Sequence, residues 1–197
     1  MTSNAHGASA FQGGWYADAR IVASPNHGAR PDGAVTDLVV IHSISLPPGE
    51  YGGGHIEQLF TNRLDWSAHP YFEQIRGSEV SAHFVILRTG ELLQFVSCDE
   101  RAWHAGRSRF EGRDNCNDFS IGIELEGLEG EAFAPAQYRA LARLLCDLRV
   151  RFLIEHVAGH EHVASGRKQD PGAAFDWQRL AIELAWPARC FPLHTVR

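Results

Sequence analysis

The sequence lacks a basic run, a long apolar stretch and a secretory signal, and each absence excludes a class of protein. A formal net charge of −6 without a basic stripe argues against a nucleic-acid partner. No apolar run approaches the roughly 20 residues needed to cross a bilayer. The N-terminus has neither the basic region nor the apolar core of a secretory signal. We therefore expect a soluble, cytoplasmic protein with no membrane partner.

Closely spaced cysteine pairs are also absent. The four cysteines are widely and irregularly spaced: Cys98, Cys116, Cys146 and Cys190. This spacing excludes a zinc ribbon, and four cysteines are too few for a disulfide-stapled scaffold of this length. We expect reduced, mostly buried thiols, with disulfides as the less favoured alternative.

The chain of 197 residues, 44% hydrophobic and 21% charged, has the composition of a globular protein with one sizeable core. Residues 1–14 are rich in Ser, Ala, Gly and Asn, which predicts a flexible N-terminal tail. We expect one domain over residues 15–186 and a C-terminal tail over residues 187–197. The sequence does not indicate an oligomeric state.

Apolar runs predict the strands of a sheet. Residues 38–44 form a nearly continuous β-branched run, which is typical of a strand buried on both faces. Residues 80–87 and 92–96 flank a turn and predict a β-hairpin. His42 lies at the carboxyl end of the first strand, where helix-covered sheets present functional side chains. A hydrogen-bonded core histidine is the alternative.

The strand predicted over residues 120–127 carries two carboxylates on one face. Its apolar residues alternate with Gly122, Glu124 and Glu126. The apolar face should pack against a helix, and the other face should be open enough to hydrate a charge. For Glu126 we expect a solvated outer position.

Apolar residues spaced by three and four predict one long helix over residues 135–154, with this stripe: Tyr138, Leu141, Leu145, Leu148 and Phe152. Shorter helices are expected over residues 55–62 and 175–186, with a turn over residues 65–70. Together the elements predict an α/β fold, a single domain with a central mixed β-sheet flanked by helices.

Residues 159–172 combine two imidazoles, a lysine and a carboxylate with bounding Gly and Pro. The segment is too polar for a core strand and too broken for one helix, so we expect a loop. A loop with this much polar chemistry indicates a site, although a solvated surface loop is the alternative.

A catalytic zinc ion needs three protein ligands and a fourth position for water, whose pKa it lowers to about 7. His42, His160 and Asp170 could supply the three ligands. Such a site also needs a general base and a cation for the oxyanion, and Glu124 and Lys168 are available. The sequence has 11 histidines, and three of them compete as ligands: His83, His104 and His162.

Five sequence blocks, in order, carry a resemblance to a known family: VIHSISLPPG (40–49), VSAH (80–83), RAWHAG (101–106), CNDFSIGIELEG (116–127) and GRKQDPGAAFDW (166–177). They resemble the AmpD family of cytoplasmic 1,6-anhydro-N-acetylmuramyl-L-alanine amidases, within the N-acetylmuramoyl-L-alanine amidase and peptidoglycan-recognition superfamily. The similarity extends over about residues 15–177.

The resemblance implies a role for each matched residue. His42, His160 and Asp170 match the zinc ligands, Glu124 the catalytic carboxylate and Lys168 the catalytic lysine. The implied reaction is hydrolysis of the lactyl–L-alanine amide of 1,6-anhydro-N-acetylmuramyl peptides in peptidoglycan recycling. His83 and His104 match positions outside the metal shell.

Substrate contacts are less defined, and we expect four residues to make them: Ser43, Tyr51, Trp103 and Arg113. Relatives often carry Asn at position 43 and can carry basic residues at positions 79 and 115, where this chain has Glu79 and Asn115. The peptide carboxylates therefore have three unranked candidates: Arg76, Arg107 and Arg113. Two other functions stay open: a muropeptide-binding module without activity, and an amidase of non-anhydro peptidoglycan.

Overall fold

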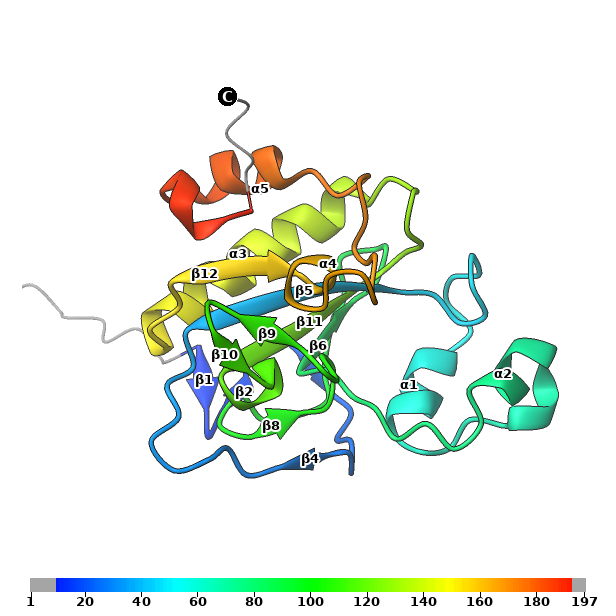
Figure 1. Ribbon diagram of the computed structural model, residues 1–197. Coiled ribbons are helices and arrows are strands. Elements are labelled where there is room, and N and C mark those ends of the chain that lie inside the picture. Colours follow the sequence, from blue (N-terminus) through cyan, green and yellow to red (C-terminus); the bar gives the residue numbers. More distant parts are fainter. Residues whose placement is uncertain (1–9, 193–197) are drawn as a thin grey trace, which may run out of the picture.

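The computed structural model describes residues 10–192 and is built around a six-stranded mixed sheet in the order β12-β5-β11-β6-β7-β3 (Figure 1). Its strands are β3 Arg20–Ile21, β5 Leu38–Ile44, β6 Phe84–Ile86, β7 Leu92–Gln94, β11 Ser120–Glu126 and β12 His156–Gly159. Strands β12, β5, β11 and β6 are parallel to one another, β7 is antiparallel to β6, and β3 is parallel to β7. The predicted fold class is confirmed.

The remaining elements are short, apart from one long helix. The α-helices are α1 His55–Phe60, α2 Pro70–Gln74, α3 Pro135–Arg151, α4 His160–Val163 and α5 Trp177–Leu184. The 3₁₀ helices are η1 Trp66–Ala68, η2 Cys116–Asp118 and η3 Ala188–Cys190. Three two-stranded pairs complete the fold: β1 Phe11–Gln12 with β2 Trp15–Tyr16, β4 His27–Gly28 with β8 Arg101–Ala102, and β9 Arg109–Phe110 with β10 Arg113–Asp114.

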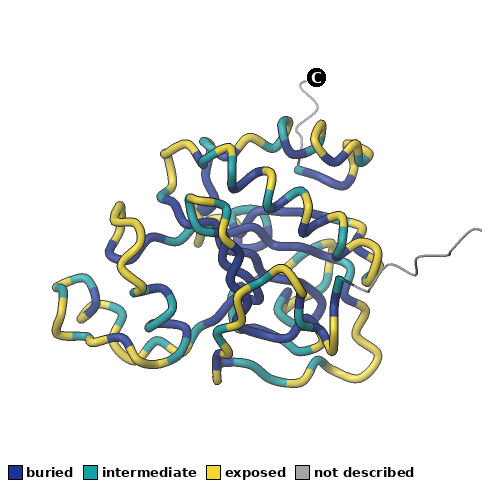
Figure 2. Tube along the Cα trace, turned by 180° about the vertical axis from the view of Figure 1, so that it is seen from behind, coloured by how far each residue is buried: buried dark blue, intermediate teal, exposed yellow. Residues whose placement is uncertain are grey.

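Helices α3 and α5 cover one face of the sheet (Figure 1). Alternate residues of β5 and β11, such as Ile41 and Ile123, pack on this side against the predicted apolar stripe of α3. The intervening residues Leu38 and Val40 face the opposite layer, where they pack with Phe119. Both faces of the central strands are thus buried, as Figure 2 shows. Successive side chains of a strand point to opposite faces of the sheet, so a strand covered on both faces buries all of its residues.

Helices α1 and α2 form a projection beside the sheet (Figure 1). Ile56, Leu59 and Phe60 of α1 pack with Phe72 of α2 and with Val85 of β6. This small core holds the projection against the body at the carboxyl end of the sheet's parallel strands.

Both chain ends contribute to the core within the described range. Phe11 and Phe191 are buried in the main core, at 4% and 7% exposure. Residues 10–14 and 187–192 therefore belong to the folded unit, where we expected tails. The tail residues 1–9 and 193–197 lie outside the described residues.

The solvated position expected for Glu126 is wrong. Its side chain is 3% exposed and accepts hydrogen bonds from the backbone N–H of Gly52 at 2.6 Å and of Arg88 at 3.0 Å. The strand alternation indicated a polar face, but two crossing loops cover it. The carboxylate satisfies their amides, as a buried charge requires.

Two local predictions also need correction. Residues 65–70 were expected to be a turn, but η1 and the start of α2 occupy them, and Pro70 stands at the first helical position of α2. The predicted loop over residues 159–172 begins with the last residue of β12 and the one-turn helix α4.

The cysteine prediction is confirmed for residues 10–192, where no disulfide forms. The thiols of Cys98, Cys116 and Cys190 are buried, whereas Cys146 is exposed. No helix of the described chain combines the length and apolarity needed to traverse a bilayer.

Candidate metal centre

Two of the predicted ligands lie at the carboxyl ends of adjacent parallel strands. Ile41 of β5 is in register with Gly159 of β12, so His42 and His160 follow at the same edge of the sheet. Parallel strands present functional side chains at this edge. A Cβ atom at Gly159 would lie 2.8 Å from Pro171 Cδ, so the close approach of this strand end to the next loop requires glycine.

The third ligand reaches the site because its loop folds back on α4. The N–H of Glu161 donates to the carbonyl of Asp170 at 2.8 Å, and the N–H of Lys168 donates to the carbonyl of Ala164 at 3.1 Å. These bonds place Asp170 beside His160 and leave Lys168 on the loop between them.

Three ligand atoms form a nearly equilateral triangle. His42 Nδ1 lies 2.9 Å from His160 Nδ1 and 3.1 Å from Asp170 Oδ2, and the last two atoms are 3.0 Å apart. All three side chains are buried. In a tetrahedral zinc site with ligands at about 2.1 Å, ligand atoms are about 3.4 Å apart. The triangle thus needs to expand by only a few tenths of an ångström.

The proton positions favour a cation between these atoms. His160 Nε2 lies 3.1 Å from the carbonyl oxygen of Ala105, which can only accept, so Nε2 carries a proton, and in the neutral imidazole Nδ1 then has none. A carboxylate also only accepts. The 3.0 Å contact between His160 Nδ1 and Asp170 Oδ2 therefore has no proton to share. A positive ion is the natural partner for both lone pairs.

The ionisation of His42 and Asp170 suits a metal. Burial lowers the pKa of His42 to about 4. Burial opposes ionisation of Asp170, but contacts with His160 and His42 hold the pKa of this carboxyl well below its usual range. These shifts leave His42 neutral and Asp170 ionised at neutral pH, the protonation states that metal binding requires of them. Two nitrogens and one oxygen also match the donor set of catalytic zinc sites.

Glu124 faces the triangle from the neighbouring strand β11, in register with His42. It is 9% exposed, and its Oε2 is buried without a hydrogen-bond partner among residues 10–192. Burial, reinforced by the charge of Asp170, raises the pKa of this carboxyl well above its ordinary value, and Lys168 opposes that rise. A carboxyl with a raised pKa is suited to exchange protons near neutral pH.

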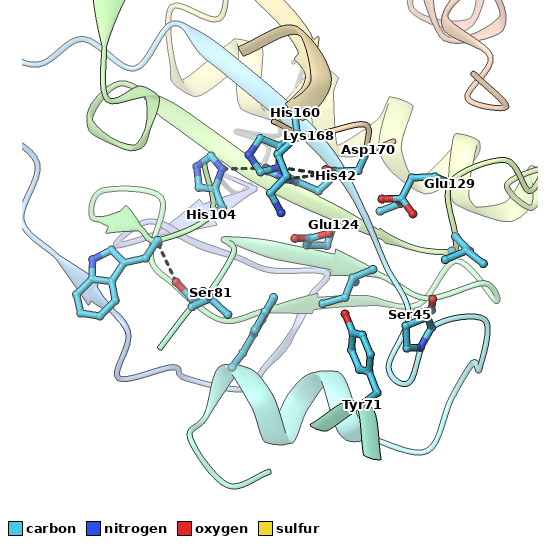
Figure 3. A pocket seen from close by; sticks show the side chains of 18 residues that line it. His42, Ser45, Tyr71, Ser81, His104, Glu124, Glu129, His160, Lys168 and Asp170 are labelled. Carbon is cyan, nitrogen blue, oxygen red and sulfur yellow. Dashed lines mark hydrogen bonds and ion pairs between the residues drawn. The ribbon is translucent and has the colours of Figure 1, made fainter. Parts of the chain in front are cut away.

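These groups meet in one cavity of about 370 Å³. Lys168 extends into it on the same side as Glu124 and the three ligands (Figure 3). The walls come from several separate regions of the chain and include Ser43, Tyr71, Trp103 and Glu129. The cavity is therefore large enough for part of a substrate beside the candidate metal.

Two residues expected to contact substrate do not line the cavity. Tyr51 hydrogen bonds to Glu131, and the Arg88 guanidinium stacks over its ring at 4.7 Å. Arg113 makes a two-pronged contact with Asp37 at 2.9 and 3.0 Å. Ser43 and Trp103 do line it.

The other predicted candidates have partners elsewhere. Arg76 pairs with Glu73, and Arg107 borders a neighbouring hollow. Among the competing histidines, His83 Nδ1 accepts from the N–H of Gly122, and His162 Nδ1 accepts from that of Gly159. Neither belongs to the triangle, and His104 contacts the triangle through His42.

Several lining residues were not singled out from the sequence, among them four polar ones: Ser45, Tyr71, Ser81 and Glu129. Tyr71 was missed because its helix α2 was not predicted. Glu129 stands in a turn after β11, where the sequence carries no signal that would mark it.

Comparisons with known proteins agree with this geometry. Residues 32–173 match the family described as N-acetylmuramoyl-L-alanine amidase. The chain is 51% identical over 169 residues to a Citrobacter freundii protein named 1,6-anhydro-N-acetylmuramyl-L-alanine amidase AmpD, covering 85% of this chain and 90% of the relative. It is 50% identical over 172 residues to the AmpD of Escherichia coli K12, covering 86% and 93%.

Solved structures show the same fold. An AmpD crystal structure superposes with a TM-score of 0.85 at 49% identity, covering 88% of this chain and 98% of that one. The E. coli amidase AmiD, solved with the substrate anhydro-N-acetylmuramic acid-L-Ala-D-γ-Glu-L-Lys, superposes with a TM-score of 0.57 at 29% identity, covering 78% and 60%.

Proposed function

Since this chain belongs to the N-acetylmuramoyl-L-alanine amidase family, we propose that it hydrolyses the lactyl–L-alanine amide bond of 1,6-anhydro-N-acetylmuramyl peptides, a reaction of cell-wall recycling. The single observation that carries the proposal is the meeting of three buried ligand atoms in one cavity with Glu124, whose Oε2 has no hydrogen-bond partner among residues 10–192. The names of the AmpD relatives supply the substrate class. The cytoplasmic location expected from the sequence stays a prediction.

His42, His160 and Asp170 would hold the metal, and zinc is the ion that fits their donor set. When bound, zinc supplies Lewis acidity to the scissile carbonyl and lowers the pKa of a water molecule toward 7. The three residues are buried, which shields their ligand atoms from bulk solvent.

Glu124 would act as the general base and then as the general acid. It accepts a proton from the attacking water while the new C–O bond forms, and it returns that proton to the alanine nitrogen as the C–N bond breaks. The raised pKa assists the first transfer, and the protonated carboxyl can then serve the second. Its unpartnered Oε2 is free for this exchange.

Lys168 would stabilise the charge that develops on the carbonyl oxygen. It extends into the cavity beside Glu124 (Figure 3). A preorganised cation of this kind typically contributes about 3 kcal/mol to the transition state. Ser43 and Trp103 border the same cavity and would contact the sugar or the peptide.

The test is release of free peptide from a 1,6-anhydro-N-acetylmuramyl peptide, measured by chromatography. We expect cleavage by zinc-loaded protein and none after treatment with a chelator, with recovery on adding zinc. A protein that binds the muropeptide but releases no peptide would be a binding module. Faster cleavage of a reduced, non-anhydro muropeptide would contradict the substrate assignment.

A further inference from the structure

The outer nitrogens of both histidine ligands contact adjacent residues of one chain segment. His42 Nε2 lies 2.9 Å from His104 Nδ1, and His160 Nε2 lies 3.1 Å from the carbonyl oxygen of Ala105. We propose that this segment, residues 103–106, is an outer cradle whose hydrogen bonds hold both imidazoles in the tautomer that presents an unprotonated Nδ1 to the metal. The proposal rests on the metal site proposed above.

The direction of the hydrogen bonds can be followed from a carbonyl group to His42. The Ser120 hydroxyl donates to the carbonyl of Cys116 at 2.6 Å, and a carbonyl can only accept. Since its one proton is used there, Ser120 Oγ can only accept from His104 Nε2, 3.2 Å away. A neutral His104 protonated at Nε2 has a bare Nδ1. That atom must accept the proton of His42 Nε2, which leaves His42 Nδ1 without one.

The second branch is shorter. The carbonyl of Ala105 accepts from His160 Nε2 and also from the Arg167 guanidinium at 2.7 Å. The Asn117 side-chain oxygen accepts from the N–H groups of His104 and Ala105, at 3.2 and 2.8 Å. Asn117 therefore fixes the N–H groups of the outer cradle, and Arg167 fixes its carbonyl group.

Gly122 provides the space for the His104 ring. A Cβ atom at position 122 would lie 2.4 Å from His104 Cγ, which is closer than any side chain tolerates. Gly122 thus lies at the point of β11 where the His104 ring packs against the strand. Its backbone N–H is bonded to His83 Nδ1 at 3.0 Å, so this part of the strand is fixed as well.

His104 is thus a positioning residue, since it acts on the metal only through His42. A purely structural role would require just a buried ring of suitable volume. Control of the His42 tautomer requires that the side chain at position 104 accept a hydrogen bond from His42 and donate one to Ser120. Outer-shell partners of this kind typically change metal affinity 10–100-fold when they are removed.

The experiment measures the zinc dissociation constant of the full chain by competition with a chromophoric chelator at fixed pH. We expect His104→Leu, which keeps the volume but not the hydrogen bonds, to weaken zinc binding about 10–100-fold. His104→Asn should recover part of the loss, because its side-chain oxygen can accept from His42. Ser120→Ala should weaken binding through the loss of its acceptor.

Two comparisons separate the tautomer role from packing. Because Ser120 acts through His104, the double variant Ser120→Ala/His104→Leu should bind zinc no more weakly than His104→Leu alone. Ser24→Ala removes another buried hydroxyl, whose hydrogen bonds to Phe60 and Asn26 involve neither the three ligands nor the outer cradle, and should leave zinc affinity unchanged.

A second readout is the imidazole nitrogen NMR spectrum of the metal-free protein. His42 should be protonated at Nε2 in the wild type and should be a mixture of tautomers in Ser120→Ala. Because Ser120→Ala is a small substitution, this variant should fold even if His104→Leu does not. Unchanged zinc affinity in Ser120→Ala with an unchanged His42 tautomer would overturn the proposal, as would additive losses in the double variant. A wild-type protein that binds no zinc would instead overturn the proposed metal site, and the outer cradle with it.

Discussion

Replacing Glu124 with Gln should destroy activity and stabilise the metal-free protein. The substitution keeps the shape of the side chain and removes its ability to take a proton. Loss of a general base typically costs about 10²–10⁴-fold in rate, or about 3–5 kcal/mol in the activation free energy. Glu124 Oε2 is buried without a partner among residues 10–192, so the folded protein is destabilised by an uncompensated carboxylate.

The expected stabilisation is at least about 1 kcal/mol, and it depends on pH. Burial raises the pKa of Glu124 above its ordinary 4.5, so between that value and the raised pKa the folded state binds more protons than the unfolded chain. The stability of the metal-free wild type therefore falls as pH rises through this window. Glu124→Gln should lack that fall. At neutral pH its melting temperature should be about 2–4 °C higher per kcal/mol.

Glu126→Gln is the matched control, two residues along the same strand. Both oxygens of Glu126 accept backbone hydrogen bonds, and an amide can replace only one of them. We expect this variant to melt at a lower temperature and to retain most of its peptide-release activity. Thermal melts from pH 4 to 8 and initial rates on the anhydro-muropeptide measure both effects. Wild-type activity in Glu124→Gln, or destabilisation equal to that of Glu126→Gln, would refute the reasoning.

Three further predictions follow from the site. At zinc concentrations 100-fold above the dissociation constant, binding should stabilise the folded protein by about 2.7 kcal/mol. Removing zinc should therefore lower the melting temperature by about 5–10 °C. An unchanged melting temperature by calorimetry would argue against a metal site in the folded protein. Lys168→Ala should reduce kcat about 10²–10³-fold with full zinc content by elemental analysis, and loss of zinc together with activity would show that the lysine acts on the metal instead. Arg113→Ala should leave KM unchanged and alter stability by less than about 1 kcal/mol, because its partly exposed guanidinium is paired with Asp37; a large increase in KM would restore it as a substrate contact.

The regular elements could be predicted because their patterns are strong. The β-branched run of β5, the alternation in β11 and the apolar stripe of α3 each repeat over at least seven residues. Strand β12, with four residues, is too short to give such a signal, and α2 is shorter than two turns. The ends of the chain were predicted as tails from their composition. A single buried aromatic residue in each, such as Phe11, does not change that composition enough to indicate folding.

The candidate ligands were chosen among 11 histidines by resemblance, because no spacing rule joins residues 42, 160 and 170. The structure joins them through the register of β5 with β12 and the return of the loop to α4. Side-chain partners were not predictable at all. Nothing in the sequence indicates that Arg113 pairs with Asp37 or that two loops cover Glu126.

Strand β12 lies at the edge of the sheet, and its four residues pair with β5 alone. His160 and Asp170 both follow this strand, whereas His42 belongs to β5. Transient detachment of β12 would therefore separate one ligand from the other two, and the measured metal affinity would decrease with the fraction of time spent detached. Conversely, a bound ion would slow amide hydrogen exchange in residues 156–163 more than in the interior strand β11.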